Sequence, residues 1–164
     1  MKKIVHATLA AIALSLSACG TLPTAEVPGV PEVPLPPISQ NNAVVALVDS
    51  ARANGTGGRL DVAAATLERA LRIEPHNPDL WHELAKTRLQ QGNATQAVSL
   101  AAKSNAWSGS NKVLRAANWR LIGEARNLLG DYPGAQTAFE NAAQVERLSG
   151  TVSTSSLNTL PGPF

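Results

Sequence analysis

Residues 63–97 carry the pattern that most restricts how this chain can fold, because they hold two helical periodicities with a proline between them. The first apolar face consists of Ala63, Leu67, Ala70 and Leu71, spaced as on one side of a helix. Pro75 cannot continue that helix, whereas Asn77 and Pro78 supply a cap and a first helical residue for the next one. The second apolar face consists of Trp81, Leu84, Ala85 and Leu89. Gly92 ends it, so the stretch predicts two consecutive helices joined by a short turn.

Parts of this arrangement recur along the chain. The small residue that opens each second helix is found at Ala63, Ala97 and Ala135, at intervals of 34 and then 38 residues. The four additional residues amount to about one helical turn, which we expect near residues 108–113. Trp81 and Trp119 occupy the same aromatic position in the second and third repeats, and packing between helices is their expected role.

This order of large, small and turn residues resembles the tetratricopeptide repeat, a helix pair of about 34 residues. The sequence departs from the repeat pattern at its tyrosine, where Asn54, Arg88 and Arg126 stand instead. The resemblance implies an all-α fold, an α-α superhelix of about three tetratricopeptide-like helix pairs. Three stacked pairs are enough to bury a continuous core, here predicted to consist mainly of alanine and leucine.

Caps and turn residues place six helices in a domain that spans residues 42–148. We expect them at residues 42–54, 61–74, 78–91, 94–107, 111–129 and 132–148. Asp61, Asn93 and Asp131 are the expected caps of the second, fourth and sixth helices, and Gln96 would complete a capping box with Asn93. Three glycines within residues 55–58 predict a frayed end of the first helix.

The first 18 residues have the layout of a secretory signal peptide. Two lysines precede an apolar stretch over residues 4–16, which is too short to span a bilayer permanently. Residues 16–19 (Leu-Ser-Ala-Cys) resemble the bacterial lipobox, which implies cleavage before Cys19 and a diacylglyceryl group on its sulfur. Gly20 follows the cysteine in place of aspartate, which by the same resemblance points to the outer membrane. The expected product is lipid-anchored at Cys19 and faces the periplasm.

Two further segments lack the composition of a folded core. Residues 19–41 begin at the lipidated cysteine and hold six prolines between Pro23 and Pro37, so we expect a disordered, extended tether. Residues 149–164 are rich in Ser, Thr, Asn, Gly and Pro, and we expect a disordered C-terminal tail.

Charge and residue types exclude several functions. The chain has 14 basic and 12 acidic residues, and removal of the signal with its two lysines leaves a formally neutral protein. No run of basic residues suggests nucleic acid, and we expect no small-molecule substrate. No histidine pairs with cysteine or carboxylates at metal-ligand spacing, and no nucleophile motif occurs, so we expect neither a cofactor nor an enzyme.

A partner-binding groove can be predicted from repeat geometry. In tetratricopeptide arrays the first helix of each pair lines the concave face, and side chains off the packed stripe point into it. The expected groove residues are Val48, Arg52, His82, Lys86, Leu89, Arg120, Glu124 and Asn127. This surface would be mildly basic with some apolar area, which suits an acidic peptide segment.

A lipid anchor, a proline-rich tether and one small repeat domain together resemble the LpoP-type lipoproteins, with residues 67–75 and 80–82 particularly similar. That resemblance implies activation of a class A penicillin-binding protein through contact with its periplasmic part, in peptidoglycan synthesis. Two other scaffolding roles stay open, a pilotin-like lipoprotein that escorts a secretin and an adaptor for a periplasmic protease. An enzyme of cell-wall cleavage is disfavoured because no paired acidic or metal cluster is present.

Overall fold

The computed structural model describes the backbone of residues 37–157 and the side chains of residues 37–149. Within that range the chain forms six α-helices and no strand, which confirms the all-α prediction. The helices are α1 (Asn42–Thr56), α2 (Leu60–Ile73), α3 (Pro78–Gln90), α4 (Ala94–Trp107), α5 (Lys112–Leu128) and α6 (Tyr132–Leu157).

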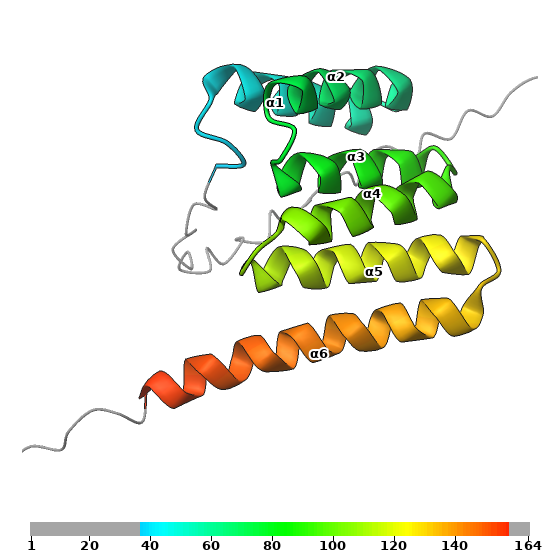
Figure 1. The fold of residues 1–164 in the computed structure, drawn as a ribbon. Coiled ribbons are helices and arrows are strands. Elements are labelled where there is room, and N and C mark those ends of the chain that lie inside the picture. Colours follow the sequence, from blue (N-terminus) through cyan, green and yellow to red (C-terminus); the bar gives the residue numbers. More distant parts are fainter. Residues whose placement is uncertain (1–36, 158–164) are drawn as a thin grey trace, which may run out of the picture. The chain divides into compact units, whose positions relative to one another are not determined.

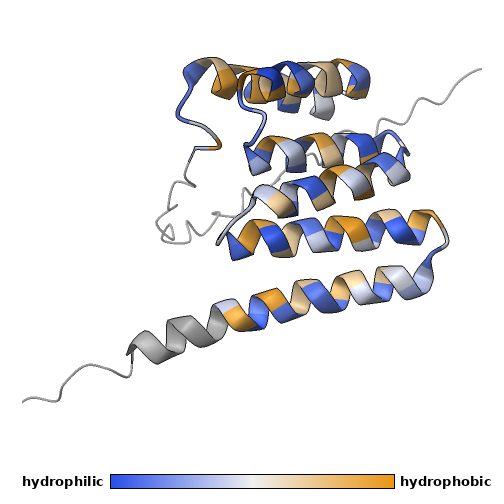
Figure 2. Ribbon diagram, viewed as in Figure 1, coloured by the Kyte–Doolittle hydropathy of each residue, from blue (hydrophilic) through white to orange (hydrophobic). Residues whose placement is uncertain are grey.

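The helices pack in sequence order as three consecutive pairs (Figure 1). Each helix contacts the next one along the chain, and α3 also contacts α5. Hydrophobic and hydrophilic residues are interspersed along the coloured parts of the helices in Figure 2, and residues three or four apart share a helix face that can be buried. The predicted stack of helix pairs is therefore confirmed.

The core is a seam of small and medium apolar side chains, as predicted. One cluster of buried residues is built on α1, α2 and α3, and a second lies mostly on α3, α4 and α5. The three alanines that open the second helices, Ala63, Ala97 and Ala135, are at most 1% exposed. Trp81 and Trp119 are partly buried and pack against these clusters, in agreement with their predicted packing role.

Several helix ends have the capping side chains and the terminal glycine that the sequence indicated. The Asn77 side chain accepts hydrogen bonds from the backbone amides of Asp79 (3.0 Å) and Leu80 (3.4 Å) and so caps α3. Asp131 caps α6 through the amide of Gly134, at 3.0 Å. Gly92 has a φ of 78°, a left-handed conformation that glycine adopts without strain at a helix end.

One predicted cap is wrong, and a second is correct in position but lacks its side-chain hydrogen bond. Asp61 lies inside the first turn of α2, whose cap position is Arg59, and its carboxylate instead accepts from Nε2 of Gln91 at 2.7 Å. Asn93 does occupy the cap position of α4 but its side chain makes no capping hydrogen bond. Its ψ is 60°, compared with 111° at Asn77, so its backbone lacks the extended conformation from which the side chain of a cap residue usually reaches the helix amides.

The domain begins earlier than predicted, because residues 38–41 are attached to it and are not part of a solvated tether. Ile38 packs against the first core cluster, and Ser39 is only 8% exposed. The Ser39 hydroxyl donates to Oε1 of Glu74 at 2.6 Å, and Nδ2 of Asn77 donates to the Ile38 carbonyl at 2.9 Å. Burial of an isoleucine and two hydrogen bonds to the α2–α3 turn explain the difference. Residues 1–36, including the predicted signal and Cys19, lie outside the described residues.

Helix α5 has the length that the sequence indicated, whereas α6 is longer than predicted. The additional turn expected near residues 108–113 is present at the start of α5, which has 17 residues where α3 has 13. Helix α6 continues to Leu157, nine residues past the predicted end at Leu148. No proline interrupts the chain there, and Gly150 alone lowers helix stability by only about 1 kcal/mol. The expected tail is thus helical over residues 149–157, and residues 158–164 lie outside the described range.

Candidate functional site

A small cavity lies on the face of α3 that was predicted to form the groove. Its volume is about 130 Å³, and its lining residues come from α1, α2 and α3. Arg52 and Lys86 are the two predicted groove residues that line it. The structure therefore brings together the first- and second-repeat cations that the sequence had placed on one face.

Glu83 joins these two cations, although it was not among the predicted groove residues. Its carboxylate accepts from Nη2 of Arg52 at 2.7 Å and from Nζ of Lys86 at 3.3 Å. Burial acts to raise the pKa of Glu83, but the hydrogen bonds and charges of Arg52 and Lys86 outweigh it, so the pKa is lowered. One carboxylate accordingly offsets half of the positive charge that these two cations bring to the predicted basic surface. The spacing of Glu83 three residues before Lys86 is the sequence signal that could have indicated this pairing.

Val48 is not a groove residue, which corrects the prediction. Its side chain is fully buried in the first core cluster together with Val44, one turn earlier. Both valines therefore lie on the stripe of α1 that packs against its neighbours. Leu89 is partly buried and packs against the second cluster, so it presents less apolar surface than we expected.

His82 points toward the interior, where it joins a hydrogen-bond network centred on Asn118. Nδ1 of His82 lies 2.7 Å from Oδ1 of Asn118, whose side chain is fully buried. The Asn118 amide nitrogen donates to Ser104 (2.7 Å) and to Asn105 (3.0 Å). An amide oxygen can only accept a hydrogen bond, so the contact to Oδ1 is a hydrogen bond when the proton of the His82 ring is on Nδ1. Ser104 in turn donates to the Pro78 carbonyl at 2.8 Å, which links α3, α4 and α5.

The predicted groove residues of α5 are exposed but do not line the cavity with Arg52. Arg120 forms an ion pair with Glu146 of α6. Glu124 and Asn127 are exposed, and within residues 37–149 no hydrogen bond or ion pair involves their side chains. The third repeat thus contributes a separate, solvated part of the surface.

Other kinds of site are not found in the part of the chain that the structure describes. No three His, Cys, Asp or Glu side chains among residues 37–149 are grouped so that they could hold a metal ion. None of the described helices combines the length and apolar character needed to cross a bilayer.

Comparisons with known proteins identify the fold. The family model of the tetratricopeptide repeat matches residues 57–113. The solved globular C-terminal domain of P. aeruginosa LpoP is similar at 37% identity with a TM-score of 0.63, over 64% of this chain and 99% of that one. The crystal structure of MamA is similar at 18% identity with a TM-score of 0.61, over 66% of this chain and 61% of that one, and this shows the fold alone. No protein with curated function matches the sequence significantly.

Proposed function

We propose, from the premise that this chain belongs to the LpoP family of tetratricopeptide-repeat proteins, that it binds and activates a class A penicillin-binding protein. The observation that carries the proposal is the 37% identity to the LpoP domain over 99% of that domain's length. The fold adds support, because stacked helix pairs of this kind serve as scaffolds for protein interaction.

In this proposal the repeat domain is held at the outer membrane by the lipid on Cys19. Residues 20–36 would act as the spacer, since the domain already begins at Ile38. In extended polyproline geometry, at about 3.1 Å per residue, that spacer would reach roughly 50 Å into the periplasm. The exposed face of α1, α3 and α5 would then contact the periplasmic part of the enzyme and stimulate its glycan polymerisation and crosslinking.

The direct test is a binding and activity assay with a purified class A penicillin-binding protein from the same organism. We expect the soluble form of the chain, with Cys19→Ser, to bind the enzyme and raise its rate of glycan polymerisation. The double variant Lys86→Ala/Arg120→Ala should weaken both effects, because it removes two exposed cations of the predicted face. Arg115→Ala is the matched control, an exposed arginine on the same helix as Arg120 but outside the predicted groove.

Absence of both binding and stimulation would contradict the proposal. Co-purification of a secretin or a periplasmic protease from crosslinked cells would instead support the pilotin-like or the adaptor role. If Arg115→Ala weakened binding as much as the double variant, the assignment of the face would be wrong while the function would stand.

The lipid anchor has its own test. We expect Cys19→Ala to move the protein from the outer-membrane fraction to the soluble periplasmic fraction, because the acyl chains supply the membrane affinity. An unchanged outer-membrane distribution of this variant would show that the anchor is elsewhere.

A further inference from the structure

A larger cavity lies between α2 and α4, with α3 as its floor. Its volume is about 670 Å³, which is within the range of about 300–1,000 Å³ typical of ligand-binding clefts. No residue of the predicted groove lines it, so this cavity was not anticipated from the sequence.

This cavity and the smaller one near Arg52 lie on opposite sides of α3. Trp81, Leu84 and Arg88 line the large cavity, whereas Glu83, Lys86 and Gln90 line the small one. Two residues along a helix correspond to a rotation of about 200°, so Trp81 and Glu83 point nearly opposite ways. The large cavity is therefore a separate surface from the one invoked for the proposed function.

The apolar residues that line the cavity come from all three helices and are held in place. Leu71 and Leu84 are 7% and 4% exposed, and Leu100 and Trp81 are partly buried beside them. The indole nitrogen of Trp81 donates to the Pro75 carbonyl at 2.8 Å, which orients the ring. A partner segment would meet a preformed apolar surface and would not have to order it.

The rim of the cavity carries an excess of positive charge. Three cations line it, Arg72, Arg88 and Lys103, against one carboxylate, Glu68. Glu68 is already paired with Nη2 of Arg88 at 2.6 Å, which leaves two cations without a carboxylate. The rim thus has a net positive charge, whereas the chain without its predicted signal has a formal net charge of zero.

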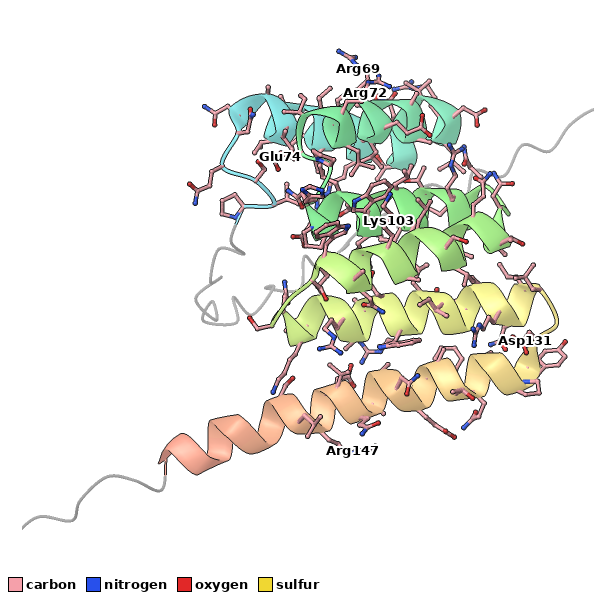
Figure 3. All side chains as sticks on the ribbon, in the orientation of Figure 1. Arg69, Arg72, Glu74, Lys103, Asp131 and Arg147 are labelled. Carbon is pink, nitrogen blue, oxygen red and sulfur yellow. The ribbon has the colours of Figure 1, made fainter. Side chains whose placement is uncertain are left out.

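The two remaining cations lie on opposite walls of the cavity. Arg72 comes from α2 and Lys103 from α4 (Figure 3). Nζ of Lys103 lies 3.9 Å from the centroid of the Trp81 ring, so its charge is placed directly beside the apolar floor. Arg72 makes no hydrogen bond or ion pair among the described side chains. Both cations are thus available to an anionic group that enters between the walls.

We propose that the cavity between α2 and α4 binds an acidic, leucine-bearing peptide segment of a protein partner. Apolar side chains of that segment would cover Leu71, Leu84 and Trp81, and its carboxylates would pair with Arg72 and Lys103. The inference goes beyond the proposed function, because it concerns the other side of α3 and requires no penicillin-binding protein.

The test uses two fluorescein-labelled octapeptides, one alternating leucine with glutamate and one alternating leucine with lysine. Fluorescence anisotropy with the soluble Cys19→Ser form should show binding of the acidic peptide and much weaker binding of the basic one. Affinity for the acidic peptide should fall as salt is added, because exposed cations are screened.

Matched variants on α2 locate the site. Arg72→Glu should weaken binding of the acidic peptide by at least about tenfold, since it places like charges against each other. Arg69→Glu makes the same charge change one turn away, where the side chain projects away from the other helices (Figure 3), and should weaken binding clearly less than Arg72→Glu. Circular dichroism of both variants checks that the helices are retained.

The proposal is overturned if the soluble protein binds neither peptide, binds both equally, or loses the same affinity with Arg69→Glu as with Arg72→Glu. A second variant, Ser99→Trp, fills the cavity from an exposed position of α4 and should also abolish binding. Unchanged binding by Ser99→Trp would place the peptide elsewhere. None of these outcomes depends on whether the chain activates a penicillin-binding enzyme.

Discussion

Replacing Asn118 by alanine should loosen the junction between the second and third repeats. Its side chain is fully buried and hydrogen-bonds to His82 of α3 and to Ser104 and Asn105 of α4. The variant removes all three bonds at once.

The magnitude follows from how well each former partner can be solvated. His82 and Asn105 are partly exposed, so water can replace Asn118 there, and Ser104 keeps its bond to the Pro78 carbonyl. Each lost bond contributes about 0.5–1.5 kcal/mol net, and the space left by the amide adds a cavity term. We expect Asn118→Ala to lower the free energy of unfolding by about 2–3 kcal/mol, or roughly 8–12 °C in Tm for a domain of this size.

Urea unfolding followed by circular dichroism measures this quantity in the soluble form of the chain. Asn105→Ala is the control, because it removes a single bond at a partly exposed position, and should lower the free energy of unfolding by at most about 1 kcal/mol. The loss of unfolding free energy in the double variant Asn118→Ala/His82→Ala should be smaller than the sum of the losses in the two single variants. The difference should be about 0.5–1.5 kcal/mol, since the two side chains share a hydrogen bond.

Equal free energies of unfolding for Asn118→Ala and Asn105→Ala would refute this account of the junction. So would strict additivity of the Asn118 and His82 substitutions. Either result would mean that His82 is free to serve the partner-binding surface and does not act mainly inside the domain.

Two further predictions concern packing and pH. A methyl group at Gly123 would come within 2.6–2.8 Å of three ring atoms of Phe139, so Gly123→Ala should destabilise the α5–α6 pair. In a chain that also carries Phe139→Ala, Gly123→Ala should instead stabilise the domain by up to about 1 kcal/mol, because alanine has the higher helix propensity. Thermal unfolding of the variants with and without Phe139→Ala shows whether the sign of the effect changes. The pKa of Glu83 is lowered from its ordinary value of 4.5, so its contribution to stability is present above that pH and is lost as the pH falls through the folded-state value. Near pH 7 the free energy of unfolding of Arg52→Ala should therefore be lower than that of the unsubstituted chain, and this difference should shrink near pH 3.5. Urea titrations at both pH values measure it. A difference that does not change with pH would exclude the ion pair as its source.

Much of the fold could be predicted because its signals act over a few residues. The step of three or four between apolar positions, the Asn77-Pro78 cap and Gly92 are local features, and each was found where it was expected. The repeat spacing even indicated the additional turn of α5. The cap at Asp61 and the capping hydrogen bond of Asn93 were not found, because the backbone conformation next to a helix depends on the preceding turn.

The candidate surface was predicted less well, because a helical periodicity does not say how far a neighbouring helix covers each face. Val48 was assigned to the groove from its place in the repeat, yet it is fully buried in the first core cluster. Asn118 could not be distinguished in advance from a solvated asparagine, since its three partners come from two other helices.

The sequence by itself determined that the chain forms helix pairs, where most of them begin and end, and which small residues let them stack. Only the tertiary structure decided that Glu83 pairs with two cations, that Ile38 belongs to the domain, and that an apolar cavity opens between α2 and α4. The physical reason is the separation along the chain of the residues that interact. Hydrogen bonds within a helix turn join near neighbours in the sequence. Burial and charge pairing depend instead on the distance between helices, which is set by packing of the whole core.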